Sequence, residues 1–328
     1  MPNESSTLFS DLLGNEELKK TLQRLVEKKA LPRVLLFHGP KGVGKCQFAL
    51  QLAKQLTGST ISVDLQTLTP EGKNDVYSAE RVRLLLEHAQ LPPHGEAKAF
   101  ILDDAHKMLP ASSNAFLKML EEPPLHTYFF LLTTHKEALL PTILSRCQTF
   151  PFSPLSTEEV VTWLESQKRS NAKHLAVLAQ GSLFKAKLLL SKEIAKCFAL
   201  IRKLFSLSLP QEYETLAACA EELEQIVMKQ EEEDLLPLCI EEILLWLRDI
   251  ECVSVEPSRV YHLNEIDLLR KWSHFLHQPL SRCIEELARV HEAIMNHVRI
   301  KAAMEHAFVW LHEMMLPRFD KMSSDILR

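Results

Sequence analysis

The chain has 328 residues, of which 46% are hydrophobic and 25% are charged, as in an ordinary globular protein with two or three domains. Its formal net charge of −5 argues against a free-standing nucleic-acid binder, because such proteins usually carry a basic surplus. Seven scattered cysteines form no C-x-x-C pair and read as free thiols, and the sequence lacks a signal peptide and any long uncharged apolar run. We therefore expect a cytoplasmic protein.

The glycines divide the chain into two parts. All eight lie at or before Gly181. Tight turns in mixed α/β folds need glycine, whereas an array of helices can form without it. The first part is therefore expected to be rich in loops, and the second to be helical.

The first predicted elements lead to a glycine-rich loop. Helical spacing of leucines predicts a helix over residues 15–29 with Asn15 as its cap. The apolar run Val34–Phe37 predicts a strand buried on both faces. After the loop, a helix is expected from Cys46 to about Leu56.

The loop, residues 39–45, has the G-x-x-x-x-G-K frame of a phosphate-binding loop between a strand and a helix. Gly39, Gly42 and Gly44 allow backbone N–H groups to surround an anion, and Lys45 adds a positive charge. The next residue should be Ser or Thr, whose hydroxyl holds Mg²⁺, but it is Cys46. A thiol is a poor ligand for a hard cation, and at a helix N-terminus it is expected to favour the thiolate, which repels phosphate.

The alternation of strands and helices continues to residue 152. We expect strands at 60–65, 99–104, 128–132 and 148–152, and helices at 78–90 and 111–122. The third strand ends in Asp103 and Asp104, which beside a phosphate-binding loop are expected to orient Mg²⁺ and the attacking water. Asp104 is one methylene shorter than the usual Glu. The pattern predicts a parallel sheet with helices on both faces.

From Ser156 the pattern is helical. Ser156 and Glu159 have the spacing of a capping box, and short helices are expected at about 157–167, 172–179 and 183–191. Longer helices follow. We predict an α/β nucleotide-binding domain at 1–153, a three-helix lid at 154–193 and an all-helical oligomerisation (collar) domain at 194–328.

Five stretches in this order resemble the bacterial sliding-clamp loaders, a branch of the AAA+ ATPases. The Leu-Glu-Glu-Pro-Pro and Ser-Arg-Cys signatures are more specific than the phosphate-binding loop, and the resemblance covers about the first 190 residues. The stretches are Phe9–Asn15, Gly39–Lys45, Ile101–His106, Asn114–Pro124 and Leu139–Gln148.

The resemblance implies a subunit of the DNA polymerase III holoenzyme, a DNA-directed DNA polymerase and nucleotidyltransferase. Its partners would be delta and tau/gamma subunits in a pentameric ring, which opens the beta clamp and closes it on primer–template DNA. Within the family the chain is similar to the stator subunits, which are poor or inactive at their own nucleotide site. These supply an arginine finger to the neighbouring tau/gamma site, and here that residue would be Arg146.

The resemblance also assigns Thr134 to the sensor-1 position, which detects the γ-phosphate. In the lid, Phe184 and Lys185 stand where active relatives often have Arg. ATP is accordingly expected to bind weakly or not at all. Many relatives carry a four-cysteine zinc module, but residues 57–98 contain no cysteine, so no zinc and no metal site is expected. His88 and His94 are the nearest approach to metal spacing.

Two other interpretations stay open. One is a catalytically active tau/gamma-type ATPase, against which Cys46 and Asp104 argue. The other is a metabolic P-loop kinase or an unrelated AAA+ remodeller, which would explain the loop and little else.

Overall fold

The computed structural model describes residues 8–58, 63–71, 75–169, 171–207, 212–229, 235–275, 280–296 and 298–313. They form two compact units. The first contains the chain up to Ser166 together with Ala179–Phe184, and the second contains Gln167–Leu178 and the chain from Lys185. The segment predicted as a separate lid, 154–193, is divided between these units. The predicted domain boundaries, 1–153, 154–193 and 194–328, stay predictions.

The first unit is built on one five-stranded sheet in the order β2-β3-β4-β1-β5, and all its strands are parallel. Burial on both faces explains why the strands read as continuous apolar runs. The strands are β1 (Val34–His38), β2 (Leu65–Leu68), β3 (Lys98–Leu102), β4 (Thr127–Thr133) and β5 (Gln148–Pro151).

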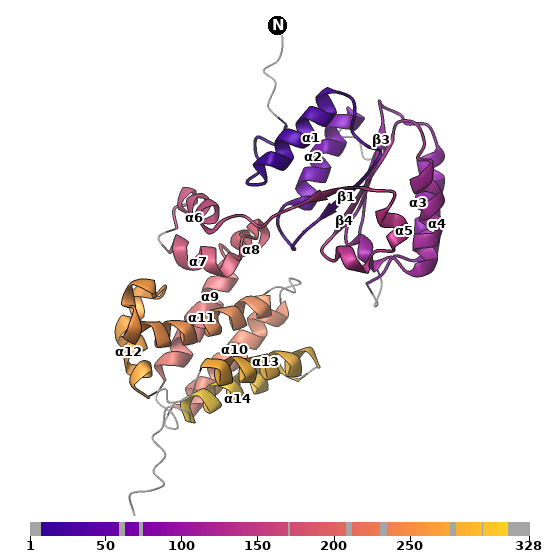
Figure 1. Cartoon of the computed structure of the whole chain (residues 1–328). Helices are drawn as coiled ribbons and strands as arrows, with labels where there is room; N and C mark the ends of the chain where they lie inside the picture. The colour runs from indigo at the N-terminus through magenta and orange to yellow at the C-terminus, as the bar shows by residue number, and fades with distance from the viewer. Residues whose placement is uncertain are drawn as a thin grey trace, which may run out of the picture. The chain divides into compact units, whose positions relative to one another are not determined.

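Helices cover both faces of this sheet (Figure 1). Because side chains alternate along a strand, Leu35 and Phe37 point to one hydrophobic cluster and Val34 and Leu36 to the other. On the first face lie α1 (Glu16–Glu27) and α2 (Lys45–Thr57). On the second lie α3 (Ala79–Gln90), α4 (Pro110–Glu121) and α5 (Pro141–Leu144).

One local prediction was wrong, and another is confirmed in position only. The second strand lies at Leu65–Leu68 rather than 60–65, since its register is set by pairing with β3, and residues 59–62 lie outside the described residues. Asn15 stands at the N-cap of α1, but its side chain makes no cap bond. Instead it exchanges two hydrogen bonds with the backbone of Ser153, which ties the start of α1 to the end of β5.

The predicted capping box at the start of α6 (Thr157–Ser166) is confirmed. The backbone N–H of Glu159 donates to the Ser156 hydroxyl at 3.2 Å, and the Ser156 N–H donates to the Glu159 carboxylate at 2.7 Å. Two short helices follow, α7 (Ala172–Ala179) and α8 (Leu183–Leu188).

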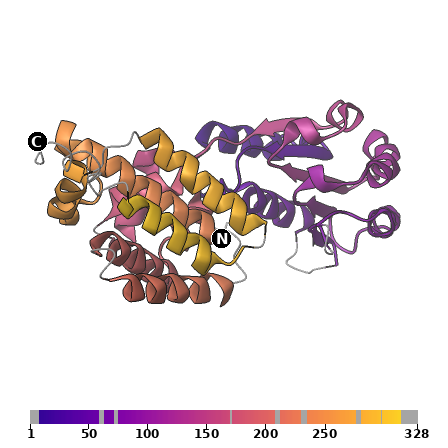
Figure 2. The same ribbon diagram turned by 90° about the horizontal axis from the view of Figure 1, so that it is seen from below.

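In the second unit, long helices surround an aromatic centre. The ring of Phe205 stacks on Trp246 at a centroid distance of 4.9 Å and meets Trp272 and Phe308 edge-on. Figure 2 shows α13 and α14 side by side, and α14 also packs on α10. These helices are α9 (Lys192–Ser206), α10 (Tyr213–Lys229), α11 (Leu235–Val255), α12 (Ile266–Phe275), α13 (Leu280–Met295) and α14 (Ile300–Glu313). Short 3₁₀ turns η1 (Ala105–Lys107), η2 (Lys136–Ala138), η3 (Pro257–Arg259) and η4 (Leu263–Glu265) complete the described elements.

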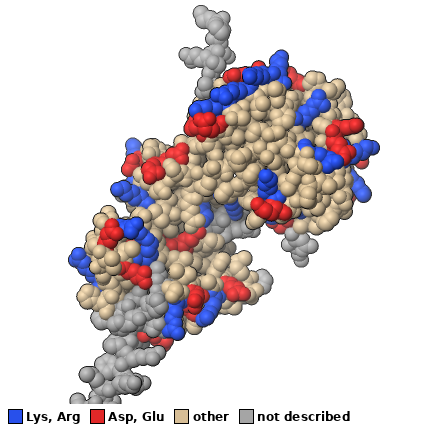
Figure 3. Space-filling view, viewed as in Figure 1, with Lys and Arg blue, Asp and Glu red and all other residues tan. Residues whose placement is uncertain are grey.

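Charges of both signs lie in small mixed groups over the described residues on the face drawn in Figure 3. That face therefore carries no continuous basic stripe of the kind that binds nucleic acid. None of the helices in the described ranges combines the length and hydropathy that crossing a membrane requires.

Candidate functional site

The phosphate-binding loop joins β1 to α2, as the sequence predicts. Gly42 has φ +79° and Gly44 has φ +100°, conformations that side chains with a Cβ rarely adopt. At Gly39 an added Cβ would lie 2.3 Å from the carbonyl oxygen of Phe152, so only glycine fits. The backbone cradle of a nucleotide site is therefore retained.

Lys45 is turned onto its own loop. Its ammonium donates to the carbonyl oxygens of Gly39 at 2.8 Å and Pro40 at 2.7 Å, and the residue is 7% exposed. Burial lowers the pKa of this lysine, while the charges of Asp103 and Asp104 oppose that shift. The ammonium is thus held by carbonyl oxygens of its own loop.

Cys46 departs from its predicted chemistry. Burial raises the pKa of its thiol, and the nearby charge of Asp103 raises it further. The side chain packs at the edge of the hydrophobic cluster formed by β1 and α2. The predicted shift toward thiolate was therefore wrong, because burial and the charge of Asp103 both favour the neutral thiol. A neutral thiol remains a poor ligand for Mg²⁺.

Residues at the start of α8 lie on the phosphate-binding loop, within the first unit. The N–H of Phe184 donates to the carbonyl oxygen of Gly42 at 3.3 Å. A Cβ added to Gly42 would lie 2.1 Å from the Ser182 hydroxyl oxygen and 2.9 Å from Phe184 Cβ. This contact brings Phe184, one of the two lid positions singled out in the sequence, against the loop.

The two strand-end aspartates differ in their surroundings. Asp103 is largely buried, which raises the pKa of its carboxyl, and its Oδ1 accepts the N–H of Asp104 at 3.0 Å. Asp104 has φ +46° and forms an ion pair with Lys107 at 3.1 Å. Lys107 also pairs with Asp75. The charges of both aspartates act on Lys45, and Asp104 is also engaged by Lys107. Their predicted roles toward Mg²⁺ and water stay predictions.

The predicted sensor residue is Thr134, but the residue that contacts the phosphate-binding loop is the preceding one, Thr133. Thr133, the fully buried last residue of β4, pairs with His38, and its carbonyl oxygen accepts the N–H of Gly39 at 3.2 Å. Its hydroxyl is 3.0 Å from Nδ1 of His106. Thr134 lies one residue beyond the strand and contacts Nδ1 of His135 at 2.9 Å. Sequence reasoning missed Thr133 and His106, since only the strand register reveals them.

Arg146 forms a local ion pair. Its guanidinium donates to one carboxylate oxygen of Glu121 at 2.5 and 3.0 Å, and also to the carbonyl oxygen of Thr142 at 2.9 Å. The side chains of Arg146 and Glu121 are 33% and 50% exposed. An exposed pair of this kind contributes only about 0–1 kcal/mol, so its exchange for a phosphate costs little.

Arg146 lies at the opposite end of the strands from the phosphate-binding loop. It precedes β5, whose first residue, Gln148, pairs with Leu35 near the start of β1. The loop follows the other end of β1, after His38. A strand of five residues spans roughly 16 Å at about 3.3 Å per residue. Arg146 is therefore separated from its own loop by about the length of a strand.

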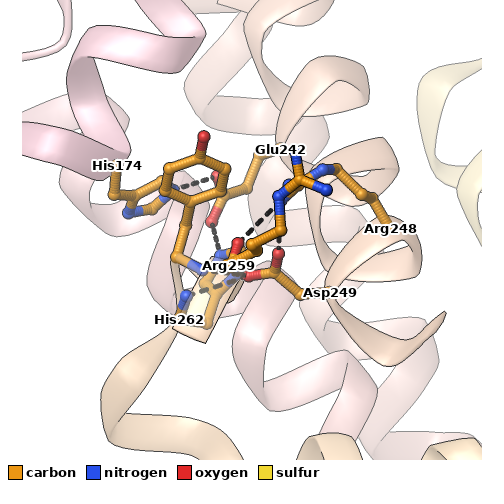
Figure 4. A network of polar contacts seen from close by, with 7 residues as sticks. His174, Glu242, Arg248, Asp249, Arg259 and His262 are labelled. Carbon is orange, nitrogen blue, oxygen red and sulfur yellow. Dashed lines mark hydrogen bonds and ion pairs between the residues drawn. The ribbon is translucent and has the colours of Figure 1, made fainter. Parts of the chain in front are cut away.

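A second polar cluster lies in the helical unit (Figure 4). Glu242 of α11 accepts from Nε2 of His174 at 2.7 Å and of His262 at 3.0 Å. Burial opposes ionisation of Glu242, but these two bonds outweigh it and lower its carboxyl pKa to about 2. Burial also opposes protonation of His262, but hydrogen bonds to Asp249 and Glu242 raise its pKa to about 9. Sequence spacing did not reveal this cluster, because its members are 68 and 20 residues apart.

A parallel sheet in the order β2-β3-β4-β1-β5, with a phosphate-binding loop after β1 and a helical array after the sheet, defines an AAA+ type of P-loop protein. A family model described as "DNA polymerase III, delta subunit" matches residues 14–156. Together with the relatives below, this match shows that the first part of the chain is similar to clamp-loader subunits of the AAA+ class.

Similar proteins include DNA polymerase III subunit tau of Escherichia coli, 33% identical over an alignment of 215 residues that covers 57% of this chain and 33% of that protein. Subunit tau of Bacillus subtilis is 31% identical over 170 residues, 47% of this chain and 30% of that protein. The replication factor C small subunit of Methanococcus maripaludis is 33% identical over 178 residues, 53% of this chain and 54% of that protein. The chain thus spans about a third to a half of the length of these relatives.

The fold is similar to a crystal structure of a DNA polymerase III gamma subunit-related protein from Thermotoga maritima. The TM-score is 0.52 at 17% identity, over 90% of this chain and 99% of that one. At this identity the likeness concerns the fold, including the helices that follow the sheet.

Proposed function

We propose that the chain acts as the delta-prime type of clamp-loader subunit, a stator that supplies Arg146 to ATP bound by a neighbouring tau/gamma-type subunit. It hydrolyses little or no ATP itself. Its partners are delta and tau/gamma subunits, and the assembled ring loads the beta clamp on primer–template DNA in replication.

The position of Arg146 carries this proposal. The guanidinium lies at the surface, at the end of the strands away from its own phosphate-binding loop, and its only anionic partner in the described residues is the half-exposed Glu121. A planar guanidinium binds phosphate through two hydrogen bonds and stabilises the charge that develops on a departing γ-phosphate. From this end of the strands, Arg146 can bind the phosphate only of a nucleotide held by another chain.

The state of the chain's own loop supports the second half of the proposal. The position of the Mg²⁺-binding hydroxyl carries the neutral thiol of Cys46. The carboxylate that should orient the attacking water, Asp104, is engaged by Lys107. The chain's own site thus lacks two of the groups on which phosphoryl transfer in P-loop proteins depends.

The purified chain is expected to hydrolyse ATP no faster than its Lys45→Ala variant, because neither variant can place Mg²⁺ and water. A steady-state phosphate-release assay with Mg²⁺ and ATP measures this. Lys54→Ala, which removes an exposed lysine from the same helix, is the matched control. A turnover that Lys45→Ala abolishes and Lys54→Ala preserves would contradict the proposal.

An active tau/gamma-type ATPase is the second candidate function. The retained glycines and Lys45, and the 31–34% identity to tau subunits, favour it. The assay above separates the two candidates, since an active subunit loses its turnover with Lys45.

A further inference from the structure

We propose that His174, Glu242 and His262 bind one divalent transition-metal ion, of which Zn²⁺ is the best fit. The site goes beyond the proposed function, and it lies entirely within the helical unit.

The three ligand atoms already converge. One ligand atom of each residue lies within 4.8 Å of the others. The Nε2 atoms of His174 and His262 both face the carboxylate of Glu242, at 2.7 and 3.0 Å. A tetrahedral Zn²⁺ with bonds of about 2.0–2.1 Å needs ligand atoms about 3.4 Å apart. The 2.7 and 3.0 Å separations go to different oxygens of Glu242 and would open by about 0.7 and 0.4 Å, and any separation near the 4.8 Å limit would close by up to about 1.4 Å.

The surroundings of His262 are those of a metal ligand. Metal-bound histidines almost always direct the second ring nitrogen to a carboxylate or carbonyl. Here Nδ1 of His262 lies 2.8 Å from Asp249, whose carboxylate also accepts the N–H groups of Tyr261 and His262. Arg248 pairs with the other oxygen of Asp249 at 2.9 Å, which fixes this carboxylate from the far side (Figure 4).

The cluster is enclosed, but it is not sealed. Glu242 and Asp249 are at most 3% exposed, and the ring of Trp246 lies 4.4 Å from that of His262. The His174 side chain is 12% exposed, so the cluster is in contact with solvent at this residue. An apolar shell of this kind strengthens the attraction between a cation and its ligands.

The ligand types select the metal. Two imidazoles and one carboxylate suit Zn²⁺ and similar transition ions, whereas Mg²⁺ and Ca²⁺ prefer sites built from oxygen. Three protein ligands leave a fourth position for water. The ligands come from α7, α11 and the segment before α12, so the bound ion would connect three separate parts of the helical unit.

Metal analysis of the full chain tests the site. Stripped chain dialysed against one equivalent of Zn²⁺ is expected to retain about one ion, while His174→Ala is expected to lose affinity at least tenfold and Asp249→Asn about 10–100-fold. His306→Ala is the matched control, because His306 also pairs with a carboxylate, Glu286, but at an exposed position. Equal retention by His174→Ala and His306→Ala would overturn the proposal.

X-ray absorption on the unaltered chain gives an answer even if a variant fails to fold. The zinc edge is expected to show only nitrogen and oxygen at about 2.0–2.1 Å. Sulfur neighbours at about 2.3 Å would assign the ion to cysteines and contradict the site, as would the absence of stoichiometric Zn²⁺ binding by well-folded chain.

Discussion

Replacing Arg146 by alanine is expected to slow ATP hydrolysis at the neighbouring subunit's site by about 10³–10⁵-fold, the effect of removing an arginine finger in other NTPases. In a ring with several ATP sites, the steady-state rate is the sum over all sites, so the loss at one site lowers it only in part. A single-turnover measurement on the reconstituted assembly resolves it, because one site's share of bound ATP should stay uncleaved. Arg146→Lys is expected to rescue little, since a lysine lacks the planar fork.

Glu121→Gln separates this role from a local structural one. It removes the ion pair of 2.5 Å but leaves the guanidinium in place. If Arg146 acts on a neighbour's phosphate, Glu121→Gln keeps the cleavage rate. If the arginine serves only its own domain, the two variants behave alike, and the proposed role fails.

Phe205→Ala is expected to destabilise the helical unit by about 3–5 kcal/mol. The fully buried ring connects α9 to Trp246 of α11, Trp272 of α12 and Phe308 of α14, with centroids 4.9–5.4 Å away. Its loss leaves a cavity between helices that cannot close without moving several of them. The hydrogen bond that the Trp272 Nε1–H donates to the backbone carbonyl oxygen of residue 205, at 2.8 Å, can persist in the variant.

Urea unfolding followed by tryptophan fluorescence measures this change, since two tryptophans flank the ring. Val255→Ala is the control, because that side chain is 87% exposed at the end of α11 and its truncation should stay within about 0.5 kcal/mol of wild type. A loss below about 1 kcal/mol for Phe205→Ala would show that the aromatic centre is not closely packed.

Most of the sheet could be predicted, because strands buried on both faces are apolar throughout. β1 and β4 were placed within one residue at each end for this reason. β2 was displaced because it is a four-residue edge strand with only one buried residue, so its apolar signal is weak. Its position follows from pairing with β3, a long-range interaction that local pattern does not contain.

The candidate site could be predicted in its residue types and less well in its chemistry. The cradle glycines and Lys45 follow from the motif alone. The thiol of Cys46 was assigned the wrong direction of pKa shift, because the helix terminus is visible in the sequence and the burial is not. Likewise, only the register of β4 against β1 distinguishes Thr133 from Thr134.

We propose that this chain contributes an arginine to another subunit's ATP site, while its own phosphate-binding loop does not support ATP hydrolysis. ATP cleavage by two reconstituted assemblies, one with Lys45→Ala and one with Arg146→Ala in this chain, tests that claim most directly. We predict an unchanged rate with Lys45→Ala and the loss of one site's cleavage with Arg146→Ala. The reverse pattern, a loss with Lys45→Ala and none with Arg146→Ala, would contradict the account and indicate an active ATPase.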